Sequence, residues 1–345
     1  MKKLLALLFT LLMVVSMLAG CGKTETEPET KADPAPSETK VERTVVRLNE
    51  VTHSVFYAPQ YAAIELGYFE EEGLAIELTN GGGADKVMTA VVSGQSDIGF
   101  AGGESCIYVY HQGKEDYPRI FAQLTKRDGS FLVGRADEDF TWDALKGKTI
   151  IGGRLGGMPE MTLEYVLRKN GLEPNVDVTV DTSVQFNMMA GAFTGGSGDY
   201  VALFEPSASQ VVLEGQGYIL CSLGEESGDV PYTTYFATQS YLKDHADTVQ
   251  RFTNAIAKAQ KWVAQHTDEE VAAVIAPQFP DTDQTLVAQV VGRLRAIGAW
   301  NETPVMTSQA WERVEDIMVG AGQLEEDARV PFETLVDNSF AEKAR

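Results

Sequence analysis

Two glycine-rich turns in the first third of the chain are the residues best placed to bind a ligand. Gly81-Gly82-Gly83 leads directly into a predicted helix over 84–93, and Gly102-Gly103 follows a predicted strand over 97–100. Free backbone N–H groups at the start of a helix are good partners for anionic or polar groups. Strand-to-helix junctions of a parallel α/β sheet lie at the carboxyl ends of the strands, where ligands bind. The stretch 43–103 therefore predicts half of a small-molecule pocket.

The motifs that would indicate catalysis are all incomplete. Gly147-Lys148-Thr149 ends like a phosphate-binding loop, but Trp142 stands where that loop requires a glycine. The run 195–198 is followed by Asp199, where a nucleophile elbow requires glycine. The 4 histidines are scattered, and the 3 cysteines lack the spacing of a metal site. We therefore predict no enzyme activity, no cofactor and no metal.

The patterns around these turns predict an α/β protein of two domains. The chain has 345 residues, which is long enough for two hydrophobic cores. A strand over 148–151, a glycine loop over 152–157 and a helix from Pro159 repeat the plan of the first unit. From Tyr241 onward the apolar residues recur at spacings of three and four, which predicts helices. The net charge of -22 argues against nucleic acid or an anionic lipid surface as a partner.

The N-terminus has the pattern of an exported, lipid-anchored protein. Residues 1–20 combine two lysines with an apolar run over 4–15, which is typical of a signal peptide. The next residues complete Leu18-Ala19-Gly20-Cys21, which resembles the lipobox of bacterial lipoproteins, where the cysteine is lipidated. An uncleaved anchor, or an ordinary signal with a chance cysteine, is the alternative. The polar segment 21–42 cannot bury enough apolar surface to fold and is predicted to be a disordered tether.

The remaining two cysteines leave two interpretations open. Cys106 and Cys221 could form a disulfide, but free buried thiols are the interpretation that we favour.

Several segments together resemble one family of transport proteins. The run His53–Ala63, the segment LGYFEEEGL over 66–74, Gly94–Gly99 and Phe204-Glu205-Pro206 are similar to the solute-binding lipoproteins of ABC importers. The resemblance is to their nitrate, sulfonate and thiamine-precursor branch, and it covers nearly the whole mature chain. The GYF…GL piece over 67–74 and the G-x-x-D-I-G piece over 94–99 are specific for the branch but do not identify the ligand.

The resemblance implies a two-lobe periplasmic-binding-protein-like fold of type II. Each lobe would be a mixed sheet flanked by helices, with the ligand cleft between them. We predict lobe I over 43–133 and 237–345 and lobe II over 134–236, with crossings near 131–135 and 232–238. Lobe closure on the ligand would present the protein, a monomer, to a membrane permease.

The resemblance also implies where the ligand-binding residues lie. They would come from the loop after the first strand, the glycine turns and the matching turns of lobe II: Thr52, His53, Phe56, Gly82, Gly83, Gly102, Gly103, Glu104, Arg154, Gly156, Met158, Glu160 and Glu205. Each of four side chains also has a structural interpretation. His53 and Phe56 could pack in the core, Arg154 could pair with a surface acid, and Glu205 could satisfy backbone N–H groups or brace the hinge.

Glu104 is the most informative of these residues. A carboxylate at a helix start is stabilised by the helix dipole in any case, so a purely structural role stays open. A carboxylate that faces the cleft would repel a sulfonate or nitrate. It would instead accept hydrogen bonds from an amino group or a protonated ring nitrogen.

We therefore expect a substrate-binding lipoprotein that captures a small polar organic solute and delivers it to an ABC permease with its ATPase. The solute that we favour resembles the pyrimidine precursor of thiamine, and an aliphatic sulfonate or nitrate is the alternative. A lipid-anchored enzyme or a ligand sensor on the same fold is the alternative of another class. The protein would be held on the extracytoplasmic side of the cell membrane by its lipid on Cys21.

Overall fold

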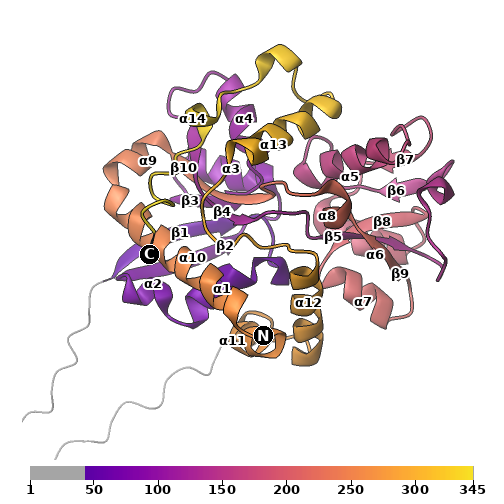
Figure 1. Ribbon diagram of the computed structural model, residues 1–345, viewed down its shortest axis with the longest axis horizontal. Helices are drawn as coiled ribbons and strands as arrows, with labels where there is room; N and C mark the ends of the chain where they lie inside the picture. The colour runs from indigo at the N-terminus through magenta and orange to yellow at the C-terminus, as the bar shows by residue number, and fades with distance from the viewer. Residues whose placement is uncertain (1–42, 345) are drawn as a thin grey trace, which may run out of the picture. The chain divides into compact units, whose positions relative to one another are not determined.

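The computed structural model describes residues 43–344, which contain two five-stranded sheets (Figure 1). The predicted signal peptide, the tether and Cys21 lie outside the described residues. Among the residues described, no helix is both long and apolar enough to cross a membrane.

The first sheet has the strand order β2-β1-β3-β10-β4. β1 pairs in parallel with β2 and β3, whereas β10 pairs antiparallel with both β3 and β4. The bounds are β1 (Thr44–Glu50), β2 (Leu74–Asn80), β3 (Ile98–Ala101), β4 (Pro118–Thr125) and β10 (Thr233–Thr238).

The second sheet repeats this plan with the order β7-β6-β8-β5-β9. β6 pairs in parallel with β7 and β8, and β5 pairs antiparallel with β8 and β9. The bounds are β5 (Ser130–Gly134), β6 (Thr149–Ile151), β7 (Thr179–Asp181), β8 (Tyr200–Phe204) and β9 (Tyr218–Ser222). Both sheets are mixed and flanked by helices, which confirms the expected architecture.

The helices around the first sheet come from both ends of the described chain. Those before the second sheet are α1 (Ala58–Glu65), α2 (Tyr68–Glu71), α3 (Ala84–Val92) and α4 (Glu104–His111). Those after it are α9 (Gln239–Asp244), α10 (Ala246–Gln265), α11 (Asp268–Ile275), α12 (Gln284–Ala296), α13 (Ser308–Gly320) and α14 (Phe332–Leu335). Apolar residues of α10 recur at helical spacing and so share one face of the helix, and this face is buried. Its residues are Val249, Phe252, Ile256, Ala259 and Val263.

The helices of the second sheet are α5 (Met158–Lys169), α6 (Met189–Thr194), α7 (Ser207–Leu213) and α8 (Leu223–Ser227). Two separate apolar clusters form around this sheet. One contains Leu163 and Leu167 of α5, and the other contains Phe193 of α6 and Val211 of α7. Short 3-10 turns complete the chain: η1 (Val55–Tyr57), η2 (Trp142–Leu145), η3 (Phe186–Met188), η4 (Ala276–Gln278) and η5 (Glu326–Ala328).

The chain changes sheets twice. It leaves the first sheet after Thr125 and enters the second at Ser130, and it returns between Ser222 and Thr233. The crossing predicted near 131–135 thus overlaps β5, a strand of the second sheet. The sequence of a strand alone does not indicate which sheet the strand joins. The lobe boundaries proposed at 133/134 and 236/237 fall within β5 and β10, and they remain a prediction.

The two cysteines of the described region are free thiols. Cys106 is buried in the core of the first sheet, and Cys221 on β9 is partly buried. This arrangement confirms the favoured interpretation of free thiols.

Candidate functional site

A small cavity lies where the loops of the two sheets meet. Its volume is about 70 Å³. The first lobe, the second lobe and the returning chain all contribute to its lining, which consists of Val51, Thr52, Tyr57, Gly83, Ala84, Gly102, Glu104, Arg154, Gly157, Met158, Pro159, Phe186, Phe204, Tyr232 and Thr233. The carboxyl ends of β1, β3 and β8 all lead into this region, as expected for a ligand site in an α/β sheet.

Six of the residues predicted from the sequence line this cavity, namely Thr52, Gly83, Gly102, Glu104, Arg154 and Met158. They come from both glycine turns of the first lobe and from the start of α5 in the second. The structure thus brings together segments that are more than 100 residues apart in the chain.

Glu104 is the ionisable group most deeply placed in this cavity. It is 1% exposed, and its Oε1 accepts a hydrogen bond from the backbone N–H of Met158 at 3.3 Å. Its Oε2 is buried and has no hydrogen-bond partner among the described residues. Burial raises the pKa of Glu104 to about 7, although the nearby positive charge of Arg154 opposes this shift. An unpaired buried carboxylate is costly, and a ligand that pairs with it would remove that cost.

Gly102 is required beside this carboxylate. A Cβ at position 102 would lie 2.0 Å from Oε2 of Glu104, which is far inside van der Waals contact. The glycine therefore makes room for the carboxylate in the turn between β3 and α4.

Four aromatic side chains form the apolar part of the cavity, and none of them is among the ligand contacts predicted from the sequence. They are Tyr57, Phe186, Phe204 and Tyr232. The ring centroids of Phe186 and Phe204 are 5.5 Å apart, and those of Phe204 and Tyr232 are 5.9 Å apart. The hydroxyl of Tyr232 is buried without a hydrogen-bond partner among the described residues. Phe204 ends β8, so the strand-end rule applied to the glycine turns could have found it.

The other predicted glycines do not line the cavity. The N–H of Gly82 is used within its own turn, where it donates to Oδ1 of Asn80 at 2.9 Å. Gly103 lies against Ile120 and Trp311 in the core. The carbonyl of Gly156 accepts from the Tyr108 hydroxyl at 2.9 Å, a contact between the lobes.

Phe56 and Glu160 also have structural partners. Phe56 is fully buried and packs on the ring of Phe204 at 5.7 Å, behind the cavity wall. Oε2 of Glu160 accepts from the N–H of Gly156 at 3.0 Å and so fixes the turn before α5. Burial, together with the negative charge of the neighbouring Glu164, raises the pKa of Glu160.

Glu205 joins the two lobes behind the cavity. Its buried carboxylate accepts from the backbone N–H of Ser209 at 3.0 Å and from the Ser209 hydroxyl at 2.9 Å. It also pairs with Arg293 of α12, which belongs to the first lobe. The Ser54 hydroxyl donates to the backbone carbonyl of Glu205 at 2.5 Å. Glu205 is thus fully used in the protein, in agreement with the structural interpretation of this residue.

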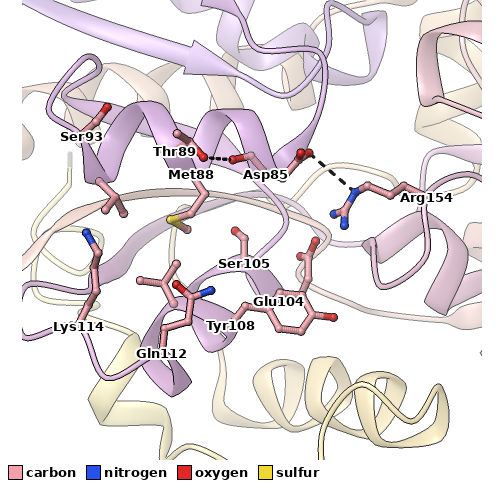
Figure 2. Close-up of a pocket in the computed structure, with 12 residues that line it drawn as sticks. Asp85, Met88, Thr89, Ser93, Glu104, Ser105, Tyr108, Gln112, Lys114 and Arg154 are labelled. Carbon is pink, nitrogen blue, oxygen red and sulfur yellow. Dashed lines mark hydrogen bonds and ion pairs between the residues drawn. The ribbon is translucent and has the colours of Figure 1, made fainter.

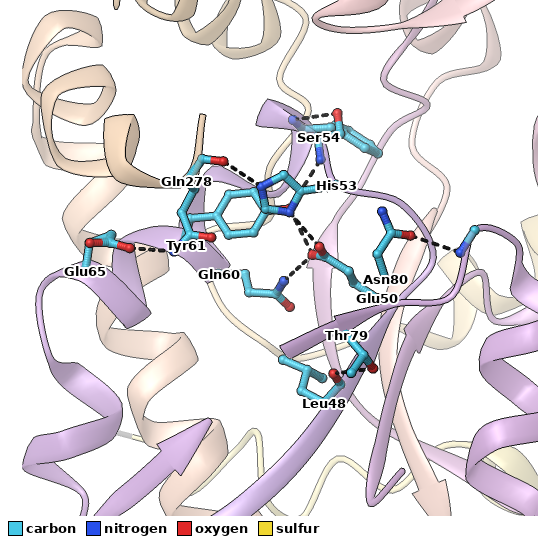
Figure 3. A network of polar contacts seen from close by, with 12 residues as sticks. Leu48, Glu50, His53, Ser54, Gln60, Tyr61, Glu65, Thr79, Asn80 and Gln278 are labelled. Atoms are coloured by element: carbon cyan, nitrogen blue, oxygen red, sulfur yellow. Dashed lines mark hydrogen bonds and ion pairs between the residues drawn. The ribbon is translucent and has the colours of Figure 1, made fainter. Parts of the chain in front are cut away.

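His53 is part of a polar network beside the cavity, not of its wall (Figure 3). Its Nδ1 lies 2.7 Å from Oε1 of the buried Glu50, and its Nε2 lies 2.8 Å from the carbonyl oxygen of Gln278. The other carboxylate oxygen of Glu50 accepts from Gln60 and Tyr61, each at 2.8 Å. Because both ring nitrogens face acceptors, His53 favours the imidazolium form and connects the Thr52 loop to η4.

Replacement of His53 should therefore cost stability in a pH-dependent way. The hydrogen bond to Glu50 raises the pKa of His53, so its contribution to stability is complete below the unfolded pKa of about 6.5. That contribution is lost as pH rises through the raised folded pKa. We expect His53→Gln to lower the free energy of unfolding by about 1–2 kcal/mol at pH 6 and by less at pH 9. Urea unfolding at both pH values measures this, and an equal loss at both would leave His53 only a packing role.

The chain matches a known protein family and a relative within known proteins. The model of the family described as "NMT1/THI5 like" matches residues 55–270. YtlA of Bacillus subtilis (strain 168), whose name calls it a binding protein, is 45% identical over 301 residues. That alignment covers 87% of this chain and 90% of YtlA.

Solved structures share the fold at low sequence identity. The alkanesulfonate-binding protein SsuA from Xanthomonas axonopodis pv. citri, bound to MOPS, has a TM-score of 0.69 at 18% identity, over 86% of this chain and 99% of SsuA. The nitrate-binding protein NrtA from Synechocystis PCC 6803 has a TM-score of 0.70 at 17% identity, over 88% of each chain.

The CA3427 gene product of Candida albicans, described as having the generic periplasmic binding protein fold, has a TM-score of 0.65 at 16% identity. The alignment covers 85% of this chain and 96% of the Candida albicans protein. These likenesses confirm the two-lobe periplasmic-binding-protein fold. The family match and the 45% identity to YtlA confirm the resemblance seen in the sequence, and the chain belongs to the NMT1/THI5-like family.

Proposed function

We propose that this protein is the extracytoplasmic solute-binding subunit of an ABC importer. The family membership supports this role, and the fold is shared with SsuA and NrtA, which are named for the solutes that they bind. The cavity at the meeting point of the lobes supports it as well. Lobe closure around a solute would give the permease and its ATPase a shape that the open protein does not present.

The observation that carries the ligand class is the unpaired Oε2 of Glu104. In a cavity lined by four aromatic rings, a carboxylate favours a flat ring that bears an amino group or a protonated nitrogen. The aminopyrimidine of a thiamine precursor has these features. It would stack on the rings of Phe204 or Tyr232 and donate a hydrogen bond to Glu104.

The volume of the cavity bears on how the solute enters. At about 70 Å³ it is much smaller than the roughly 300–1,000 Å³ of ordinary ligand pockets. The lobes are joined by direct contacts such as Tyr108 to Gly156 and Ser54 to Glu205. Solute entry would therefore require the lobes to separate and then to close again around the solute.

The N-terminal segment completes the proposal. Lipidation of Cys21 would hold a monomer on the outer face of the cell membrane, and residues 21–42 would be the tether between lipid and lobes. This arrangement would keep the binding protein close to its permease and raise the effective concentration of the pair.

One observation favours the alternative ligand class. Arg154 lines the cavity, and its Nε lies 3.8 Å from Oδ1 of Asp85, a long and half-exposed contact that an anion could replace. A sulfonate or nitrate would pair with Arg154 but would lie close to the carboxylate of Glu104. We favour the aminopyrimidine because the unpaired buried group is the acid.

A thermal-shift panel tests this proposal on the full-length chain purified in detergent. The panel contains aminopyrimidines, thiamine, taurine and other sulfonates, nitrate, and amino acids. A ligand at a hundred times its dissociation constant should stabilise the fold by about 2.7 kcal/mol. We expect a shift with an aminopyrimidine that disappears in Glu104→Gln. A shift with sulfonates alone would instead make Arg154 and the glycine N–H groups the binding site.

A further inference from the structure

A second and larger pocket adjoins the cavity on the first lobe (Figure 2). It has a volume of about 490 Å³ and lies between α3 and α4. Glu104 and Arg154 line both this pocket and the small cavity. The two volumes therefore meet at the Glu104 and Arg154 side chains, and a ligand that displaces these side chains could extend from one volume into the other.

The charges of this pocket are separated along its length. At one end, Arg154 lies close to Asp85, and the carboxylate of Glu104 points toward this pair (Figure 2). At the other end is Lys114, which forms no ion pair with any described residue. The buried Oε2 of Glu104 also has no partner there. The pocket thus presents one carboxylate oxygen without a hydrogen-bond partner at one end and an ammonium group without an ion pair at the other, among the described residues.

The side chains between these ends suit the middle of an organic molecule. Met88, Val92 and Val109 are apolar, and the Thr89 hydroxyl donates to the carbonyl of Asp85 at 2.7 Å. The eight residues of α4 rise about 12 Å along the helix axis, and Lys114 lies three residues beyond the end of α4. Only an elongated ligand could therefore reach both charged ends.

We propose that the pocket between α3 and α4 is an extension of the solute site, which binds the anionic tail of an elongated zwitterion whose nitrogenous head lies at Glu104. This inference rests on the proposed function. Lys114 is the residue that selects the tail, and Met88, Val92 and Val109 contact the chain between head and tail. A solute without an anionic tail would use the head site alone.

Thiamine and thiamine monophosphate test this proposal, because they share an aminopyrimidine head and differ only in the anionic tail. Titration calorimetry on the full-length protein in detergent should show about threefold tighter binding of the monophosphate, the size expected for one partly exposed charge pair. The preference should weaken between 50 mM and 500 mM salt, because exposed charges are screened.

Three variants separate the tail site from the head site. Lys114→Gln should remove the preference for the monophosphate and leave thiamine binding unchanged. Lys261→Gln makes the same charge change on α10, outside the pocket, and should keep the preference. Thr89→Phe, at an exposed position of α3 on the pocket wall, should fill the space and weaken only the monophosphate.

The failures of the two proposals give different results. Equal binding of both compounds by the wild-type protein would overturn the tail site and leave the head site standing. A preference that survives Lys114→Gln would remove the role of this lysine and overturn the proposal. Binding of neither compound would overturn the aminopyrimidine head and the tail site together.

Discussion

Glu104→Gln should weaken solute binding by about one to two orders of magnitude while it stabilises the unliganded protein. Binding suffers because a carboxylate accepts a charge-assisted hydrogen bond from an amino group or a ring N–H⁺, and an amide accepts only a neutral one. Stability improves because the buried Oε2 has no partner in the described residues and is costly while it is charged. The two effects have opposite signs, which a general loss of folding could not produce.

The pH dependence of folding indicates how much Glu104→Gln should stabilise the unliganded protein. The pKa of Glu104 is raised to about 7, so the folded protein binds a proton that the unfolded chain releases near pH 4.5. Folding stability that depends on this proton is complete below pH 4.5 and is lost as pH rises to 7 and above. The shift corresponds to about 3 kcal/mol at pH 8, which Glu104→Gln should recover. Urea unfolding from pH 5 to 8 measures this difference.

Glu160→Gln is the matched control for this experiment. Burial and the negative charge of Glu164 also raise the pKa of Glu160, but the Glu160 carboxylate accepts from Gly156 and does not line the cavity. The control should flatten the pH profile of stability and leave solute affinity within about twofold of the wild-type protein. If Glu104→Gln and Glu160→Gln reduced affinity equally, Glu104 would be a structural acid and the aminopyrimidine proposal would lose its support.

Arg293→Met should destabilise the protein by about 3–5 kcal/mol, because it leaves the buried carboxylate of Glu205 without its cation. The side chain of Glu205 is 0% exposed, whereas that of Arg293 is 35% exposed. The Glu205 carboxylate would keep its hydrogen bonds from Ser209 in this variant. Because these bonds still stabilise the buried charge, we expect a loss of stability near the lower end of this range. Urea unfolding at pH 7 measures the loss.

Arg293→Met should also weaken the contact between the lobes. Arg293 belongs to α12 of the first lobe, and Glu205 directly follows β8 of the second. Small-angle X-ray scattering of the unliganded variant should therefore show a larger radius of gyration than that of the wild-type protein.

Two controls separate the pair from its surroundings. Arg295 lies two residues from Arg293 and on another face of α12, and its partner Asp268 is one-third exposed. The loss of stability in Arg295→Met should therefore stay near 1 kcal/mol. The double variant Glu205→Gln with Arg293→Met removes both charges and should recover much of the stability. If the double variant were as unstable as Arg293→Met alone, the damage would come from lost packing and not from the uncompensated carboxylate.

Local patterns in the sequence were sufficient for most of the secondary structure. The strands predicted over 97–100 and 148–151 became β3 and β6, and the helical spacing predicted after Tyr241 is that of the buried face of α10. Such patterns succeed because a strand or an amphipathic helix repeats its requirement along the chain itself. The segments 53–63, 66–74, 94–99 and 204–206 also sufficed to indicate the family that the match over residues 55–270 shows.

The composition of the candidate site depended on contacts between distant segments. Thr52 lines the cavity and its neighbour His53 does not, because Glu50 and the carbonyl of Gln278 engage the His53 ring. Gln278 is 225 residues away in the chain. No local pattern around Thr52 contains that information.

Contacts between distant segments also explain why Glu104 and Glu205 have different roles. Glu104 and Glu205 both follow strand ends and both are buried, so their local sequences predict the same role. Arg293, 88 residues away, pairs with Glu205, whereas one oxygen of Glu104 has no partner among residues 43–344. The sequence by itself determined that acids stand at these two junctions. The tertiary structure decided which one is left for a ligand, because the charge that neutralises a buried group comes from an element that only folding brings beside it.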